Sequence, residues 1–355
     1  MIARLTRNQA LIAGGVVAVV VIGGATTYAL SGKDSKSAAP PSPSTSISST
    51  PSPSPTASKP APTPPPPVNP LTGLGKPPTG PILAVKIDDT ANGRPSLGLD
   101  KADVIYIEQA EGGLTRMVAV FGTHKPLVEA VRSVRASDAE LLSQYGPITL
   151  IASGGGGDSL TTLRNSTVHG VINDSGGPGF SRDANRPAPY NLQSNLTQVS
   201  AAVKTGGSHN IGFSFSASDP RLASAKTAGG IKTVVGGTPV TFVWDAGLHR
   251  YARTVNGSRL YAADGAPIAS PNVLVQLCTV TVNPHDVDVM GNPSQFTHSV
   301  GSGRVVLFRN GKRIEGKWSR ASAASATRFT DLAGKPLLLA PGGAIVLLAT
   351  VGAPV

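Results

Sequence analysis

Residues 1–70 constrain this chain most, because an uncharged apolar stretch is followed by a segment that cannot build a packed core. The apolar stretch runs from Ala10 to Leu30, and Arg4 and Arg7 precede it. About 20 apolar residues are enough for a transmembrane helix, so residues 10–30 predict a membrane anchor. Positive charge before the span favours a cytoplasmic tip of residues 1–9, with the later residues outside the membrane.

A cleaved signal peptide is the alternative reading of this stretch. Cleaved signals carry an apolar core of about 7–15 residues and an A-x-A-like cleavage site. Here the core is longer, no clean site of that kind follows, and no cysteine near residue 30 offers a place for a lipid. We therefore expect a single-pass protein of the cell membrane with its C-terminal domains outside, and we keep cleavage and secretion as the alternative.

Residues 31–70 are mostly Pro, Ser, Thr and Ala. With so few large apolar groups, the segment cannot offset the entropy of ordering, so we expect a disordered linker. Its runs PSPSP and PTPPPP favour polyproline II at about 3.1 Å per residue, which gives a spacer on the order of 100 Å. Attachment of sugars to its Ser and Thr residues is left open.

Composition limits the classes of molecule that we expect this chain to bind. The formal net charge is +11, which outside a membrane favours anionic envelope polymers or lipid headgroups, although ordinary solubility explains it equally well. Aromatic residues make up 5% and no Lys/Arg-rich run is present, so we expect no nucleic-acid partner. A single cysteine, Cys278, rules out an internal disulfide, and its apolar surroundings predict a buried side chain.

Residues 71–235 alternate short apolar runs with helical patterns. Four runs predict buried strands, and two segments, 137–145 and 192–203, predict helices, the first capped by Ser137 with Glu140 in a capping box. This mixture predicts an α+β or α/β domain with a mixed sheet and a polar cleft. The four runs are PILAVKI (81–87), VIYIE (104–108), MVAVF (117–121) and ITLIA (148–152).

Residues 236–355 show a different pattern, in which short strands alternate with Gly- and Pro-containing turns. Asn256-Gly257 and Asn310-Gly311 are strong hairpin signals. Many short strands with regular punctuation predict a β-rich second domain, either a small barrel or a sandwich. The change of pattern places the domain boundary near Gly236.

Polar residues of the first region cluster where the predicted strands end. Ligands of open α/β sheets favour the crevice at the carboxyl ends of strands, so we expect these residues to converge there. Two carboxylates about 5–10 Å apart could act as acid and base on a glycosidic bond, which makes Asp88 and Glu108 the catalytic candidates. The ligand-binding candidates offer guanidinium or amide donors suited to anions and sugars: Arg94, Arg116, Arg132, Arg135 and Asn191. The alternative is that acids and arginines simply pair and tie loops together.

Three other motifs are weaker. The run from Ser153 to Ser159 (SGGGGDS) lacks the Gly-Lys-Ser/Thr ending of a phosphate loop, so it predicts either a turn or a backbone anion nest. Ser133 lies between two arginines, and no G-x-S-x-G elbow supports a serine hydrolase. His285, Asp288 and His298 fit no strong ligand spacing, so we expect no metal and no cofactor.

Several ordered segments resemble the YerB-like family of two-domain bacterial envelope proteins, which are often lipoproteins of unknown function. The segments are NPLTGL (69–74), residues 84–121, VRSVRASD (131–138), RPAPYNL (186–192), NVLVQ, Gly301-Ser-Gly303, NGKRIEGKWSR and PGGAIVLL. The resemblance implies an envelope location and two domains, and it transfers no catalytic residue. This chain departs from the family in two places, with an apolar span in place of a lipidated cysteine and with Tyr190 where a histidine is expected.

Three functions remain open from the sequence. The first is a membrane-anchored extracytoplasmic protein that binds a cell-wall or other anionic envelope glycan. The second is an envelope enzyme that cleaves or modifies glycan through the cleft carboxylates. The third is a non-catalytic partner of envelope assembly proteins.

Overall fold

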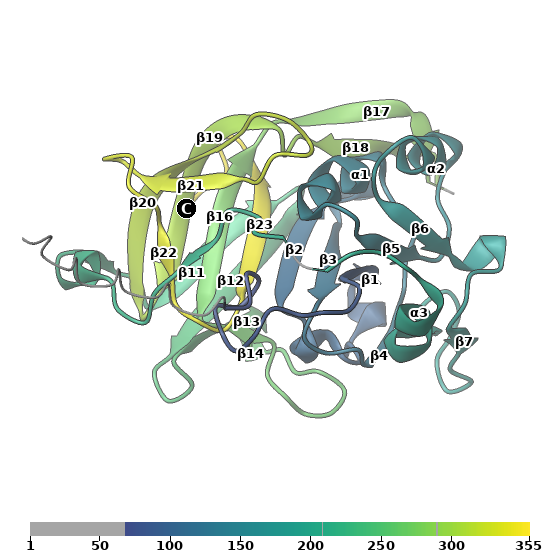
Figure 1. The fold of residues 1–355 in the computed structure, drawn as a ribbon, viewed down its shortest axis with the longest axis horizontal. Helices are drawn as coiled ribbons and strands as arrows, with labels where there is room; N and C mark the ends of the chain where they lie inside the picture. Colours follow the sequence, from purple (N-terminus) through teal and green to yellow (C-terminus); the bar gives the residue numbers. More distant parts are fainter. Residues whose placement is uncertain (1–67, 208, 289) are drawn as a thin grey trace, which may run out of the picture. The chain divides into compact units, whose positions relative to one another are not determined.

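A mixed sheet of eleven strands organises the computed structural model, which describes residues 68–207, 209–288 and 290–355 (Figure 1). Strands of both sequence regions contribute to this sheet, which contains parallel as well as antiparallel pairs. From one edge to the other the order is β10 (Lys226–Thr227), β20 (Lys312–Arg320), β19 (Gly301–Arg309), β16 (Asn272–Cys278), β23 (Ala344–Thr350), β2 (Val104–Gln109), β3 (Thr115–Phe121), β1 (Leu83–Asp88), β5 (Thr149–Ala152) and β6 (His169–Ile172), and β21 (Arg328–Asp331) pairs with β20.

A second sheet packs on one face of the first. It consists of β11 (Gly230–Val235), β12 (Thr238–Asp245), β13 (Arg250–Val255), β14 (Ser258–Arg259) and β15 (Ala269–Ser270). Phe242 and Tyr251 share a buried apolar cluster with Val275 and Leu347 of the large sheet. Both predicted hairpins are confirmed, since Asn256 and Asn310 have positive φ angles and Val255 pairs with Ser258 across the first turn.

The other face is covered by helices and by a hairpin from the second region. Helix α1 (Ala136–Leu142) continues into the 3-10 helix η4 (Ser143–Tyr145), and α2 (Gly157–Arg164) lies beside it. The hairpin of β17 (Val280–Val287) and β18 (Pro293–Thr297) contacts both helices, as Figure 1 shows. Leu142 and Tyr145 pack with Tyr106 and Val118 of the sheet in the second apolar cluster.

Shorter elements complete the described chain. A three-stranded sheet joins β4 (Leu127–Glu129), β8 (Leu192–Asn195) and β7 (Phe180–Arg182), and it leads into α3 (Leu196–Ala202). Strands β9 (Ser214–Phe215) and β22 (Leu338–Leu339) form a parallel pair. The remaining 3-10 helices are η1 (Ala91–Gly93), η2 (Leu99–Lys101), η3 (Glu111–Gly113), η5 (Asn173–Ser175) and η6 (Pro220–Ala223).

Two helix predictions need correction. The helix expected over 192–203 is wrong in its first four residues, because Leu192–Asn195 alternates in burial and pairs with two strands as β8. The helix expected over 137–145 begins one residue earlier and is not capped by Ser137. Instead the Asp138 carboxylate accepts the Arg135 N–H at 2.7 Å, and from Ser143 the helix tightens to 3-10 geometry.

The two regions on either side of Gly236 share one sheet. Strand β2 of the first region pairs in parallel with β23 of the second, and each apolar cluster draws residues from both regions. That residues 71–235 and 236–355 are two separate domains therefore stays a prediction. The expected small barrel is wrong for the described residues, because β16, β19, β20 and β23 extend the sheet of the first region instead of closing on themselves.

The predicted anchor, residues 10–30, and nearly all of the predicted linker lie outside the described residues. Within the part of the chain that the structure describes, no helix has the length and apolar character needed to cross a membrane. The linker prediction extends slightly too far, because Asn69 is buried and its side chain accepts the Leu71 N–H at 2.9 Å.

Candidate functional site

The site begins with a row of polar residues across three neighbouring strands. On β3, Arg116 lies opposite Asp88 of β1 and opposite Glu108 of β2. Directly opposed residues of antiparallel strands point to the same face, so these three side chains leave the sheet together. Since β1 and β2 both end there, the sequence argument about strand ends agrees with the register.

Lys86 is the deepest charge of this row. It lies two residues before Asp88 on the same face, is fully buried, and pairs with Glu108 and with Asp138 of α1, the latter at 2.7 Å. Burial raises the pKa of Glu108 to about 8, the charge of Lys86 opposes this shift, and Asp138 adds to it. Glu108 is buried beneath the helix, with a side chain only 1% exposed.

Asp88 is sealed as well. Its side chain is 0% exposed, and Oδ2 lies 3.5 Å from Arg116 Nη2 and 3.4 Å from Arg132 Nε without a hydrogen bond of its own. The Arg132 guanidinium lies 5.4 Å from the centre of the Tyr190 ring, in cation–π range. Tyr190 thus supports Arg132 at the position where the resemblance to the family led us to expect a histidine.

Arg135 occupies the loop before α1. Its Nη2 donates to Glu111 Oε2 at 2.5 Å and its Nη1 donates to the Ser133 carbonyl at 2.9 Å. Burial alone would raise the pKa of Glu111, but the hydrogen bond and the charge of Arg135 outweigh it, and that pKa is lowered. Burial lowers the pKa of Arg116, and the like charges of Arg132 and Arg135 add to the effect while Asp88 opposes it. We call Arg116, Arg132 and Arg135 the arginine cluster.

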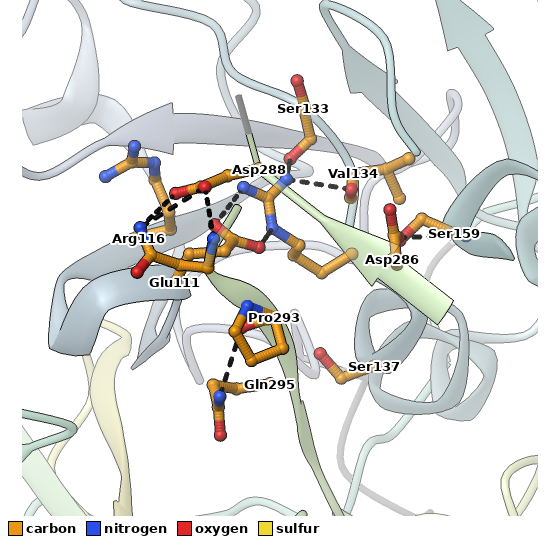
Figure 2. Close-up of polar contacts among 12 residues, drawn as sticks. Glu111, Arg116, Ser133, Val134, Ser137, Ser159, Asp286, Asp288, Pro293 and Gln295 are labelled. Carbon is orange, nitrogen blue, oxygen red and sulfur yellow. Dashed lines mark hydrogen bonds and ion pairs between the residues drawn. The ribbon is translucent and has the colours of Figure 1, made fainter. Parts of the chain in front are cut away.

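The β17–β18 hairpin closes one side of this cluster. Figure 2 shows Asp288, from the turn of the hairpin, beside Glu111 and Arg116. Hydrogen bonds from Asn292 lower the pKa of Asp288, and the positive charge of Arg135 contributes. A wall of the site therefore comes from the second sequence region, which strand ends in the first region could not have indicated.

In the ion pairs of the arginine cluster, the acid is the more deeply buried partner. The carboxylate is more buried than its arginine in Arg132–Asp88 (23% against 0% exposed) and in Arg135–Glu111 (13% against 8%). The acids thus hold the guanidiniums from behind. Among the described residues the Arg132 side chain, 23% exposed, makes no hydrogen bond and keeps donors free, whereas Arg135 donates from Nη1 to the Ser133 and Val134 carbonyls and from Nη2 to Glu111. Guanidinium groups fixed in this way suit planar, bidentate recognition of carboxylate or phosphate groups.

Two predicted ligand residues lie apart from the cluster. Arg94 pairs at 3.1 Å with Asp89, whose bidentate partner is Arg253 of the second sheet. Asn191 accepts from Arg182 at 2.9 Å and donates to the Asp183 carbonyl at 3.2 Å, so its side chain is engaged within the β7–β8 loop. Sequence reasoning also missed Lys86 as part of the site, although a lysine inside the apolar run PILAVKI is itself a signal of a buried charge pair.

The Gly-rich run after β5 receives an anion from the chain itself. Asp286 of β17 accepts from the Ser159 N–H at 3.3 Å and from the Ser159 hydroxyl, at the start of α2. A side chain at Gly156 would have no room, because its Cβ would lie 1.4 Å from Asp286 Oδ1. The anion nest considered from the sequence is therefore filled by Asp286.

This arrangement predicts that Gly156→Ala lowers the free energy of unfolding by about 1–3 kcal/mol, the usual cost of overpacking. Gly157→Ala is the matched control, since its Cβ would meet nothing within 4 Å, and it should be neutral or slightly stabilising. Urea unfolding of both variants checks the difference. Equal stability of the two variants would contradict the Asp286 contact.

His285, Asp288 and His298 are the metal-ligand candidates of the sequence. His298 bonds to Thr281 at 2.9 Å, His285 is exposed, and the described residues contain no group of three or more His, Cys, Asp or Glu side chains arranged around a common point for a metal ion. Cys278 is buried as predicted, and burial raises the pKa of its thiol to about 12. This thiol is therefore protonated and unreactive.

Comparison with known proteins places the chain. A family model described as "Protein of unknown function (DUF3048) N-terminal domain" matches residues 71–209, and the corresponding C-terminal domain model matches residues 231–346. The chain belongs to the YerB-like two-domain family. It is 27% identical over 252 residues to "Putative lipoprotein YerB" of Bacillus subtilis (strain 168), covering 68% of this chain and 73% of that protein.

The fold of the family also agrees. A crystal structure of the YerB protein from Bacillus subtilis matches with a TM-score of 0.65 at 21% identity, and the match covers 79% of this chain and 96% of that one. The mixed-sheet, strand-rich architecture is thus shared. The family descriptions name no ligand or reaction, so the chemistry of the site is argued from its geometry alone.

Proposed function

We propose that this YerB-like protein is a membrane-anchored extracytoplasmic envelope protein that binds an anionic cell-wall polymer through the arginine cluster. The observation that supports this most is the arrangement of the ion pairs, in which Asp88 and Glu111 lie behind guanidiniums and that of Arg132, 23% exposed, keeps donors free of other described residues. Carboxylate or phosphate groups along a glycan are ligands of the matching chemistry. Arg94 and Asn191 would act as outlying contacts to the same extended polymer.

The envelope location draws on the relative and on the N-terminal sequence. The Bacillus subtilis relative carries a name that calls it a lipoprotein, which fits an envelope-associated family. In this chain residues 10–30 would replace the lipid as the membrane anchor, with Arg4 and Arg7 on the cytoplasmic side. Cleavage and secretion remain the alternative for these residues, and binding to envelope assembly proteins remains an alternative for the partner.

One feature favours the enzymatic alternative, namely that burial raises the pKa of Glu108 to about 8, in the direction that a general acid needs. However, Glu108 is 1% exposed and Asp88 is 0% exposed. A glycosidic oxygen cannot reach either carboxyl group in this conformation. The geometry therefore supports binding better than hydrolysis.

The test is retention of the full chain, in detergent, on purified cell wall. Arg132→Gln should weaken retention about tenfold or more, because a charge-assisted hydrogen bond contributes about 1.5–3 kcal/mol. Its unfolding temperature should change little, since Asp88 keeps Arg116 and accepts the Thr90 N–H at 2.7 Å. Arg164→Gln on the exposed side of α2 is the matched control and should bind as the wild type does.

Two results would count against the proposal. If Arg132→Gln binds normally but unfolds far more easily, the arginines merely neutralise buried acids. If soluble fragments are released from the wall by the wild-type chain and not by Glu108→Gln, the enzymatic alternative gains the support. Assaying the bound and released material in the same experiment separates the three outcomes.

A further inference from the structure

A separate cavity of about 240 Å³ lies at the other end of β2, among the loop before β1, strands β13, β15 and β23, and the 3-10 helix η2. We propose that it binds a free aliphatic amino acid. The proposal does not rest on the arginine cluster, because Ile105 at the start of β2 lines this cavity whereas Glu108 lies at the end of the same strand.

The size and the walls of the cavity select a small ligand with an aliphatic part. Leu99, Ile105, Ile268 and Ile345 line it, so an aliphatic side chain would replace water against apolar surface. A cavity of about 150 Å³ holds benzene, and drug-sized ligands need about 300 Å³ or more. The observed volume lies between these limits, which is the range of a single amino acid.

Arg250 supplies a cation at the wall. Its Nη1 donates to the Ala269 carbonyl at a long 3.4 Å. Asp245, its partner across the β12–β13 pair, forms its ion pair with Arg259 at 2.7 Å instead. Among the described residues Arg250 therefore has no carboxylate partner, and its guanidinium is available to a ligand carboxylate.

Asp100 supplies an anion at the same cavity. Its side chain is 5% exposed, and its Oδ2 pairs with Lys101 at 2.5 Å. Its Oδ1 is buried and has no hydrogen-bond partner. A buried carboxylate oxygen without a donor carries a desolvation penalty, which a ligand ammonium group would relieve. An aliphatic amino acid carries the carboxylate, the ammonium group and the apolar side chain that these walls require.

The experiment is calorimetric titration of the full chain in detergent with leucine, as either enantiomer. Binding of leucine is expected, and two analogues should bind at least tenfold more weakly. 4-Methylpentanoate lacks the ammonium group that Asp100 would hold, and isopentylamine lacks the carboxylate that Arg250 would hold. No heat and no change in NMR spectra at millimolar leucine would overturn the proposal, as would equal binding of either analogue.

Variants assign the site. Arg250→Gln and Asp100→Asn should each weaken leucine binding at least tenfold, whereas Arg328→Gln, at the exposed first residue of β21, removes the same charge elsewhere and should leave it unchanged. Ala102→Leu fills the cavity without altering a charge and should abolish binding. It tests the site independently of the charge variants, in case these fail to fold. Undiminished binding in Arg250→Gln and Ala102→Leu would place the amino acid elsewhere and overturn the assignment.

Discussion

Replacing Lys86 with Met should lower the free energy of unfolding by about 3–5 kcal/mol at pH 8, the usual effect of removing one partner from a buried ion pair. Lys86, Glu108 and Asp138 are all at most 1% exposed, so the substitution leaves two carboxyl groups buried without their cation. Urea unfolding measures the loss. Glu108→Gln is the matched control, because glutamine resembles the protonated acid, and it should cost much less than Lys86→Met.

The pH dependence of this loss follows from the raised pKa of Glu108, which is about 8 in the folded chain against an ordinary 4.5. Below pH 4.5 both states hold the proton, whereas between the two values only the folded state holds it. Stability from this group therefore falls as pH rises through that window and levels off above about pH 8. The deficit of Lys86→Met should shrink toward pH 5, where Glu108 can be neutral in the folded chain. A deficit that is the same at pH 5 and pH 8 would contradict the buried triad.

Replacing Asp89 with Leu should lower the free energy of unfolding by a similar amount, about 3–5 kcal/mol, because it leaves the buried charge of Arg253 without a carboxylate partner. Arg253 is 3% exposed and donates twice to Asp89, at 2.8 and 2.7 Å, and among the described residues its guanidinium otherwise contacts the Met117 sulfur. The double variant Asp89→Leu with Arg253→Met should recover most of the loss, since no buried charge then lacks a partner.

Arg304→Met tests whether burial determines how much stability an ion pair contributes. Arg304 pairs with Glu315 at 3.0 Å, but both side chains are exposed by more than a third, so its loss should amount to about 0–1 kcal/mol. Burial opposes ionisation of Asp89, yet Arg253 outweighs it and the pKa of Asp89 is lowered. The contribution of this pair should therefore persist down to the ordinary carboxyl range and disappear only below it. If the double variant of Asp89 and Arg253 is no more stable than Asp89→Leu alone, the unpaired charge of Arg253 is not the cause of the loss.

The sequence was most informative where local physics decides the structure. The apolar runs ending at Asp88, Glu108 and Phe121 are strands β1, β2 and β3, and the two Asn-Gly pairs close hairpins. The agreement follows because a buried strand needs a continuous apolar run and a two-residue hairpin turn needs positive φ angles. The convergence of acids and arginines at one end of the sheet followed from the same strand-end argument.

Long-range pairing could not be read from these patterns. Nothing local indicates that Val104 pairs with Ala344, that Asp286 reaches the start of α2, or that Arg253 meets Asp89, 164 residues away. The wrong helix over 192–203 has a related cause. Residues 192–195 carry no strong local preference, and pairing with β4 and β7 makes them a strand.

The position of β23 sets an order of events during synthesis. This last strand, Ala344–Thr350, lies between β2 and β16 in the middle of the large sheet. A ribosome must therefore release the chain as far as Thr350 before the two halves of the sheet can join, and until then β2 and β16 each present an unpaired edge. Such late, long-range closure slows folding and exposes strands to aggregation. A nascent or truncated chain that lacks its last dozen residues should thus be a substrate for chaperones and proteases even though most of its sequence is present.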